Sequence, residues 1–262
     1  MAKWLALDET PPLGTFIFSG SPSVAEVAGL AGFDFVIIDR EHSPSSWDTT
    51  VALVRAVAAA DCPALVRVTG MDSVEIGHAV DSGAAGVMVP RVSAPHDVQA
   101  IVAAARYAPL GQKGACPVSR NAGLGLRRHD YASVTEESNQ RFLLVGIIED
   151  RLGIENLDAI LAEKPGLDLV LLGRSDLAAD LSHVGDIRHR EVEAAVARYV
   201  AVTAPTAKGG MVVTAGEDAG AWIDAGMRML VLGIDLEILA RAYSEAASAH
   251  RTTLERRAAP LG

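Results

Sequence analysis

Eight short runs of apolar residues recur along the 262-residue chain, and this repetition constrains the fold more than any other feature. Each run is continuously apolar rather than alternating, as expected of strands buried on both faces. Helical patterns with apolar residues at three- and four-residue spacing lie between the runs. Eight strand–helix repeats in a chain of this length predict one (β/α)8 barrel domain spanning residues 1–262. The runs are Thr15–Phe18, Phe33–Ile38, Ala64–Val68, Gly86–Val89, Phe142–Ile148, Leu169–Leu172, Gly210–Val213 and Met229–Leu232.

Local signals agree with this architecture. Ser21 followed by Pro22 is typical of a helix start, and Asp72 with Glu75 three residues later resembles a capping box. Gly83 stands where a glycine commonly ends a helix. The structural alternative is an open doubly wound sheet, which usually has a Gly-x-Gly-x-x-Gly turn after its first strand. The first run here is followed by Ser-Gly-Ser-Pro, which favours the barrel.

Two segments depart from the repeat. The pattern degenerates between Tyr107 and Arg141, which predicts a long loop of the kind that often covers or binds a ligand. The last helical stretch begins at Asp235 and, with its tail, runs through residue 262, longer than a barrel needs. From its pattern alone, this helix either packs on another subunit or ends as a terminal helix with a frayed tail.

Composition excludes several classes of protein. The net charge is −10, with 33 acidic and 23 basic residues, which argues against nucleic acid or an anionic membrane as partner. No stretch reaches the roughly 18 apolar residues of a membrane span, and the N-terminus lacks the pattern of a signal peptide. Cys62 and Cys116 belong to no CxxC motif, which is typical of a reducing compartment. We therefore expect a cytoplasmic protein.

Two carboxylates follow neighbouring strands, and in barrels of this kind the chemistry lies at the carboxyl ends of the strands. Glu149 comes directly after the fifth run, and Asp176 follows the sixth. Two carboxylates completed by waters and substrate oxygens are a common way to hold Mg²⁺ or Mn²⁺. Taken singly, Glu149 is equally well a salt-bridged or helix-N-terminal acid, and Asp176 an N-cap of the segment Leu177–Leu181. Together they predict a metal site.

Two further polar residues belong to the same predicted rim. His42 follows the second run, where a histidine can transfer protons near neutral pH or simply bond to a neighbouring carboxylate. Arg67 lies within the third run, near its end, and a permanent charge there is costly unless it is paired or binds an anion. Arg67 is therefore expected to anchor a substrate carboxylate or enolate oxygen, to pair with Asp39 or Glu41, or to do both.

The positions of the four lysines bear on whether the predicted site could use covalent catalysis through a lysine. A Schiff-base mechanism needs a lysine amine in the active site, but none of the lysines directly follows a predicted strand. A metal ion is then expected to supply the electron sink. The lysines are Lys3, Lys113, Lys164 and Lys208.

In this order, the motifs resemble the HpcH/HpaI family, the metal-dependent (class II) pyruvate aldolases. The resemblance runs from about Gly14 to His250. It is carried by residues 32–35 leading to Asp-Arg-Glu-His at 39–42, Val-Arg at 66–67, Asp-Ser-Gly-Ala at 81–84 leading to Val-Pro at 89–90, Arg-Tyr at 106–107 with Pro109 and Gly111, Ile-Glu at 148–149, and Gly-Arg-Ser-Asp-Leu at 173–177.

The resemblance implies cleavage of a 4-hydroxy-2-oxo acid to an aldehyde and pyruvate, or an analogue such as hydroxypyruvate. It implies that Glu149 and Asp176 bind Mg²⁺, Mn²⁺ or Co²⁺ and that Arg67 holds the keto or enolate oxygen. The substrate carboxylate would lie near Gly173 and the backbone amides of Ser175 and Asp176. His42 would act in proton transfer, with Asp81 reaching it from a neighbouring subunit. It also implies a homohexamer, a trimer of dimers whose last helix is exchanged between subunits.

The chain departs from the commoner family pattern around the substrate. Arg174 replaces a proline, Ile147 replaces a glutamine found in some members, and Lys113 replaces an arginine. Because these changes surround the substrate, the identity of the acceptor aldehyde stays undecided. Three other functions stay open as well: a citramalyl- or malyl-CoA type lyase, an oxaloacetate decarboxylase, and a barrel that binds keto acids without catalysis.

Overall fold

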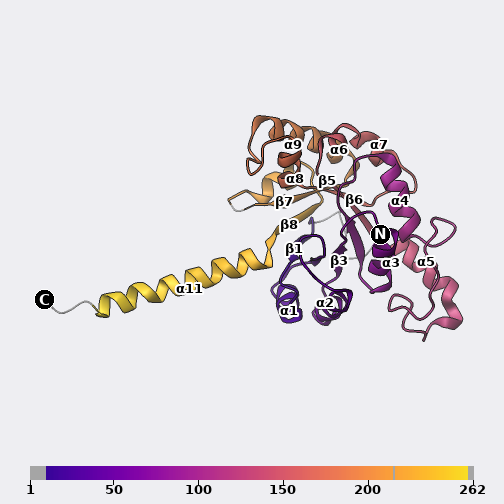
Figure 1. The fold of residues 1–262 in the computed structure, drawn as a ribbon, viewed down its shortest axis with the longest axis horizontal. Coiled ribbons are helices and arrows are strands. Elements are labelled where there is room, and N and C mark those ends of the chain that lie inside the picture. Colours follow the sequence, from indigo (N-terminus) through magenta and orange to yellow (C-terminus); the bar gives the residue numbers. More distant parts are fainter. Residues whose placement is uncertain (1–9, 215, 259–262) are drawn as a thin grey trace.

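The structure, a computed structural model, describes residues 10–214 and 216–258 and contains a closed barrel of eight parallel strands (Figure 1). Each strand pairs with the next in sequence, and β8 pairs with β1. Every predicted apolar run overlaps one strand, so the (β/α)8 prediction is confirmed. The strands are β1 (Leu13–Ile17), β2 (Phe35–Asp39), β3 (Ala64–Arg67), β4 (Gly86–Val89), β5 (Leu143–Ile148), β6 (Leu169–Leu172), β7 (Gly209–Val213) and β8 (Met229–Ile234).

Helices connect the strands and surround the barrel, as Figure 1 shows. The connection from β5 to β6 uses two short helices in series, and two single 3-10 turns precede α5 and β7. The helices are α1 (Pro22–Leu30), α2 (Trp47–Ala59), α3 (Ser73–Asp81), α4 (Pro95–Ala105), η1 (Arg128–Asp130), α5 (Tyr131–Arg141), α6 (Arg151–Glu155), α7 (Leu157–Ala162), α8 (Arg174–Asp180), α9 (Arg190–Thr203), η2 (Ala204–Thr206), α10 (Ala219–Asp224) and α11 (Asp235–Ala258).

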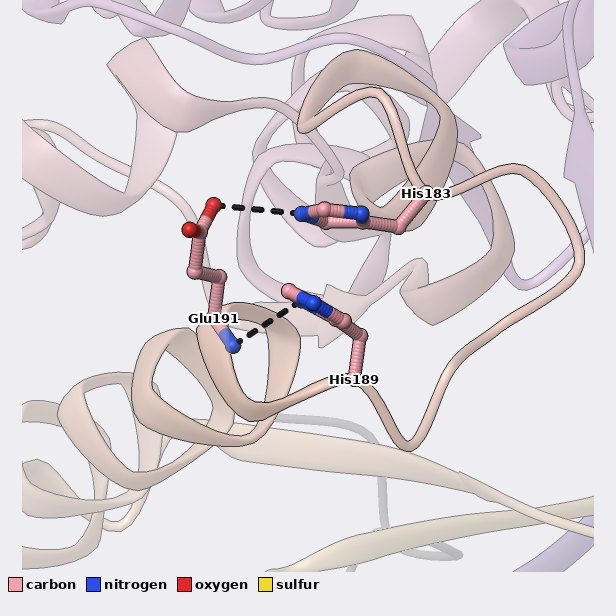
Figure 2. Close-up of side chains that lie close together, drawn as sticks. All are labelled: His183, His189 and Glu191. Atoms are coloured by element: carbon pink, nitrogen blue, oxygen red, sulfur yellow. Dashed lines mark hydrogen bonds and ion pairs between the residues drawn. The ribbon is translucent and has the colours of Figure 1, made fainter.

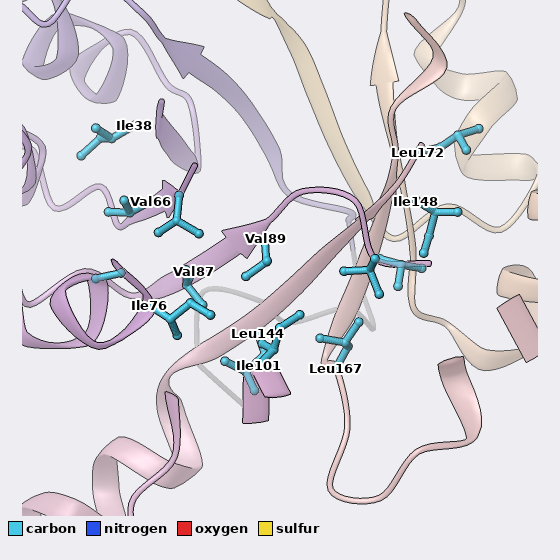
Figure 3. Close-up of a cluster of buried hydrophobic side chains, with 14 of the residues drawn as sticks. Ile38, Val66, Ile76, Val87, Val89, Ile101, Leu144, Ile148, Leu167 and Leu172 are labelled. Carbon is cyan, nitrogen blue, oxygen red and sulfur yellow. The ribbon is translucent and has the colours of Figure 1, made fainter. Parts of the chain in front are cut away.

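Side-chain alternation along the strands produces two buried layers. In β2, Phe35 and Ile37 face the barrel interior, whereas Val36 and Ile38 face the helices. Figure 3 shows part of the outer layer, where strand residues meet Ile76 of α3 and Ile101 of α4. Because both faces of every strand are covered, each strand reads as a continuous apolar run.

The predicted helix ends are largely confirmed. Ser21 caps α1 with Pro22 at the first helical position, and Gly83 after α3 has φ +80°. The side chain of Asp72 accepts hydrogen bonds from the backbone N–H groups of Val74 and Glu75. The capping-box expectation is only half right, because Glu75 forms an ion pair with Arg40 rather than returning to Asp72.

The segment from Tyr107 to Arg141 is not loop throughout. Its last eleven residues form α5, preceded by the single turn η1. The only buried residues of α5 are Val134 and Ser138, so the helix lacks the apolar periodicity by which a sequence reveals a helix.

Helix α11 leaves the barrel and extends into solvent (Figure 1). Residues 240–251 are all exposed, and Tyr243 keeps 71% of its surface accessible. None of the described helices is both long enough and apolar enough to cross a membrane.

Candidate active site

The inward-facing positions of four strands, β2, β3, β5 and β6, lead to polar groups or glycine at one end of the barrel. Leu65 faces the interior, so Arg67, two residues on, faces the same way. By the same two-residue spacing, Asp39 follows Ile37, Glu149 follows Ile147 and Gly173 follows Leu171 on the inward face. These side chains therefore lie at the carboxyl end of the barrel, where the active sites of such barrels are found.

A pocket of about 350 Å³ lies at this end. It brings together His42, Arg67, Glu149 and Asp176, four residues that the sequence analysis selected. Gly173 and Ser175 also line it, as expected for the predicted substrate-binding segment. Apolar side chains form much of the remaining wall: Phe16, Phe18, Ile147, Leu171, Ile187, Val212 and Ile234.

Glu149 is buried at the end of β5, and its Oε1 accepts a hydrogen bond of 2.8 Å from the backbone N–H of Arg91. Burial raises the pKa of Glu149 to about 7, and the nearby carboxylates of Asp176 and Glu41 add to the increase. The Arg91 N–H and the Arg67 charge oppose it without cancelling it. Glu149 is thus a buried acid that keeps its proton to a higher pH than an ordinary glutamate does.

Asp176 lies in the first turn of α8, where its side chain is exposed to the pocket. It is not the N-cap that the sequence alternative proposed, because α8 begins at Arg174 and its N-cap is Gly173. The apolar residues after Asp176 suggested a later helix start, but the helix begins directly behind β6. The Asp176 carboxylate lies close enough to Glu149 to contribute to the raised pKa of that residue.

Arg67 makes the ion pairs that were one of its two predicted roles. Its Nε lies 2.5 Å from Oδ1 of Asp39, and its Nη1 lies 3.4 Å from Oε2 of Glu41. The guanidinium also lies over the rings of Phe16 and Phe18, with its carbon 4.8 and 5.6 Å from their centroids. These contacts fix the plane of the guanidinium group. Arg67 also lines the pocket, so the group is held at the pocket wall.

His42 and Asp81 are not brought together within one chain. The His42 side chain is 49% exposed at the pocket, with Nε2 3.8 Å from Oε2 of Glu41, too far for a hydrogen bond. Asp81 ends α3 and pairs with Lys113 Nζ at 2.8 Å. It lines a separate pocket between α3 and α4.

The three lysines that the structure describes lie outside the pocket around Glu149. Lys113 pairs with Asp81, and Nζ of Lys208 donates to the backbone oxygen of Leu167. Neither these two nor Lys164 lines the pocket around Glu149. Lys3 lies outside the described residues. For the described lysines, the geometry agrees with the argument against a Schiff base.

Sequence reasoning missed the ion pair that holds Arg174, a residue of the pocket wall. Arg174 is buried, and its two terminal nitrogens lie 2.6 and 2.8 Å from the carboxylate oxygens of Glu217. The guanidinium also donates to the backbone oxygen of Val212 and lies over the ring of Trp222. Arg174 was noticed only as a departure from the family pattern. Its partner is 43 residues away, and no local pattern marks it.

Sequence reasoning also missed the backbone contribution of Arg91. This residue has φ +56°, a left-handed conformation that is uncommon for residues other than glycine. Its N–H is the hydrogen-bond donor that holds Glu149. Almost every residue type has a backbone N–H, so the identity of residue 91 does not mark it as a donor and only the geometry reveals this role.

Comparison with known proteins identifies the family of this chain. The sequence profile described as HpcH/HpaI aldolase/citrate lyase matches residues 13–242, which include every residue of the candidate site. The chain belongs to this family. Its membership confirms the resemblance predicted from the motifs, and with it the expectation of a carbon–carbon lyase.

Relatives of the HpcH/HpaI family align over nearly the whole chain. A hydroxypyruvate/pyruvate aldolase of Chromohalobacter salexigens is 31% identical over 251 residues, covering 94% of this chain and 96% of its own. A 4-hydroxy-2-oxovalerate aldolase of Novosphingobium aromaticivorans is 35% identical over 238 residues, covering 88% and 87%. A solved HpcH/HpaI family protein from Burkholderia cenocepacia superposes with a TM-score of 0.85 at 33% identity, covering 95% of this chain and 98% of its own.

Proposed function

We propose that this member of the HpcH/HpaI family is a metal-dependent aldolase that reversibly cleaves a 4-hydroxy-2-oxo acid to an aldehyde and pyruvate, or an analogue such as hydroxypyruvate. The observation that carries the proposal is the convergence of Glu149, Asp176 and Arg67 on one pocket. The names of the aligned aldolases support the same reaction class.

We assign a divalent ion to Glu149 and Asp176. Both offer carboxylate oxygens, the donors that Mg²⁺ and Mn²⁺ prefer. Gly173 supports the fit, because a Cβ there would lie 2.7 Å from Oε2 of Glu149 and would fill the space that this carboxylate uses. Burial is the main cause of the raised pKa of Glu149, and repulsion from Asp176 and Glu41 adds to it; a cation would offset that repulsion. Mg²⁺, Mn²⁺ and Co²⁺ are the candidates.

The ion, when bound, would supply the positive charge that stabilises the enolate left as the C3–C4 bond breaks. Arg67 would hold the keto oxygen, because Asp39 and Glu41 fix its guanidinium beside the pocket. The first-turn N–H groups at Ser175 and Asp176 have no partners within α8 and would bind the substrate carboxylate.

We assign removal of the 4-hydroxyl proton to His42, directly or through water. Its exposed ring at the pocket supports this role. Asp81 of the same chain lies in a different pocket, so it would reach a His42 ring only across a subunit interface. The proposed proton path therefore depends on assembly.

We propose a homo-oligomer, a hexamer built from dimers, in which α11 packs on a neighbouring barrel. The helix is solvated over residues 240–251, and Leu232 within β8 keeps 37% of its surface exposed. Val27 and Leu30 of α1 are 62% and 71% exposed. Apolar surface on both a projecting helix and the adjacent barrel wall is what an exchanged helix would cover. A cytoplasmic location is part of the same proposal, to be tested by cell fractionation.

The proposed reaction is tested by pyruvate release from a panel of 4-hydroxy-2-oxo acids, coupled to lactate dehydrogenase. Protein stripped with EDTA should be inactive and should recover on addition of Mn²⁺ or Mg²⁺. Glu149→Gln keeps the shape of the side chain but removes its charge, and it should stay inactive with metal present. Activity that survives chelation would refute the metal mechanism.

The same measurement separates the alternatives. Turnover of oxaloacetate alone would favour a decarboxylase, and turnover of an acyl-CoA substrate would favour a CoA-thioester lyase. Keto-acid binding that needs no metal and leads to no product would favour a binding protein. The absence of all three, with aldol cleavage present, supports the proposal.

A further inference from the structure

A second group of potential metal ligands lies in the connection between α8 and α9. His183, His189 and Glu191 each offer one ligand atom, and these atoms lie within 4.8 Å of one another. Within residues 10–214 and 216–258, this is the one cluster of three or more histidine, cysteine or acidic side chains close enough to share an ion. None of the three lines the pocket around Glu149.

The two imidazole rings are stacked. Their centroids lie 3.4 Å apart with 26° between the ring planes, and Figure 2 shows the Glu191 carboxylate at the edge of the His183 ring. A ring nitrogen of His183, Nε2, lies 3.2 Å from Oε2 of Glu191. In a tetrahedral site with bonds of about 2.0–2.1 Å, neighbouring ligand atoms are roughly 3.4 Å apart. The His183–Glu191 pair already has this spacing.

The backbone holds these residues in place. Ser182 has φ +67°, which turns the chain directly after α8, and the N–H of His183 donates to the backbone oxygen of Ala178. Two successive turns follow, with Asp186 N–H bonded to His183 and His189 N–H bonded to Asp186. A fixed backbone means that metal binding needs only side-chain rotation, so little ordering cost opposes it.

Side-chain rotation is available at His189. Its Nδ1 accepts the backbone N–H of Glu191 at 3.3 Å, a long hydrogen bond. Rotation of the ring would exchange this bond for a bond to an ion and would also open the ring stack. The His183 and Glu191 side chains are 24% and 48% exposed, so an ion can enter from solvent and keep a water ligand.

We propose that His183, His189 and Glu191 form a second metal site, one that takes Zn²⁺ or a similar nitrogen-preferring divalent ion. Two imidazoles and one carboxylate, with a fourth position left to water, are a ligand set that suits Zn²⁺. The site differs in preference from the oxygen pair at Glu149 and Asp176, because Mg²⁺ binds imidazole poorly.

An ion at this site would join the turn that follows α8 to the first turn of α9. The connection between His183 and His189 carries Ile187, whose side chain lines the pocket around Glu149. Bound Zn²⁺ would therefore fix the segment that bears this wall residue.

The test uses full-length protein in which the oxygen pair is removed, the double variant Glu149→Gln/Asp176→Asn. Isothermal titration with Zn²⁺ should give one site per chain, and Co²⁺ should produce visible absorption bands. His183→Gln and Glu191→Gln, each added separately, should weaken binding by more than the roughly 10–100-fold that loss of an outer-shell partner costs. His96→Gln, a change at an 81% exposed histidine elsewhere, should have no effect.

Wild-type protein in excess Mg²⁺ provides a second route if the double variant fails to fold. Zn²⁺ at about a hundred times its dissociation constant should then raise the Tm by about 5 °C, and His183→Gln should abolish the increase. The proposal is overturned if no saturable Zn²⁺ binding occurs, or if His183→Gln and Glu191→Gln bind as tightly as their parent. Because these readouts need no catalysis, failure of the aldolase proposal would not affect them.

Discussion

Gly173 lies so close to Glu149 that a Cβ at residue 173 would be 2.7 Å from Oε2 and 2.8 Å from Cβ of Glu149. Glu149 is held from its other side by the backbone N–H of Arg91. The glycine therefore leaves room for the carboxylate that we assign to the metal ion. Steric clearance and a backbone donor together fix its position.

Gly173→Ala tests this clearance. The added methyl group meets the Cβ of Glu149 as well as its carboxylate, so the strand ends must shift, at a cost of about 1–3 kcal/mol. We expect Mn²⁺ affinity and kcat/KM to fall at least tenfold, measured by titration calorimetry and the coupled pyruvate assay. Gly70→Ala is the control, because nothing lies within 4 Å of a Cβ there. Unchanged metal affinity in Gly173→Ala would contradict the assignment of Glu149 as a ligand.

Metal affinity should depend on pH through Glu149. Burial, together with Asp176 and Glu41, raises the pKa of Glu149 to about 7 in the metal-free protein. A metal ion binds the ionised carboxylate and must displace the proton below that pH. We expect the Mn²⁺ dissociation constant to be nearly constant above pH 8 and to rise up to about tenfold per pH unit below pH 7. A dissociation constant that stays flat from pH 8 to pH 6 would refute this coupling.

The Arg174–Glu217 pair should contribute to stability. Glu217→Gln removes the charge that partners a buried guanidinium, and breaking such a pair costs about 3 kcal/mol. The measurement is urea unfolding at pH 7. Glu136→Gln, which changes an exposed acid of α5, is the control and should change stability by less than about 0.5 kcal/mol. Equal stability of Glu217→Gln and wild type would mean that Arg174 finds another partner.

The Arg174–Glu217 pair should also make the stability of the folded protein depend on pH in the acid range. Burial raises the pKa of Glu217, but the hydrogen bonds from the Arg174 side chain and the Thr214 backbone outweigh burial and lower it to about 2. Because the folded-state pKa is depressed, the stabilisation is fully present above the unfolded value of about 4.3 and is lost as pH falls toward 2. Unfolding measured between pH 5 and pH 2.5 should show a steeper loss of stability for wild type than for Glu217→Gln.

Arg67→Lys keeps the positive charge but loses the planar fork that meets Asp39 and Glu41. A lysine cannot hold both carboxylates and a substrate oxygen in one geometry. We expect kcat/KM to fall about 100-fold while metal affinity changes little, measured by steady-state assay and calorimetry. A loss of metal affinity as large as the loss of activity would mean that Arg67 acts by supporting Glu149.

Assembly should depend on α11. Tyr243→Glu places a charge on the projecting helix at a residue that is 71% exposed in the single chain. If a neighbouring barrel covers this residue, the substitution should shift the mass seen by light scattering toward smaller species. Val184→Glu, at an 82% exposed residue far from α11 in sequence, is the control. A mass unchanged by Tyr243→Glu would leave the helix without a role in assembly.

The sequence predicted the barrel because strands covered on both faces must be continuously apolar, and eight such runs have one compact closed arrangement. It also placed Glu149, Asp176, Arg67 and His42 at one rim, since the carboxyl ends of parallel strands share one end of the barrel. It misjudged α5 as loop and the N-cap of α8, where apolar periodicity is weak or the helix begins directly behind a strand.

The residue pattern by itself thus determined the fold and placed Glu149, Asp176, Arg67 and His42 at the pocket, because strands follow from periodicity and the residues at their carboxyl ends share one end of the barrel. Only the tertiary structure decided the contacts that join distant segments without a local signature. These are the Arg91 N–H on Glu149, the Arg174–Glu217 pair, and the separation of Asp81 from His42 within one chain. Each depends on which distant segments the closed barrel brings within a few ångströms of each other. The spacing of residues along the chain does not predict those contacts.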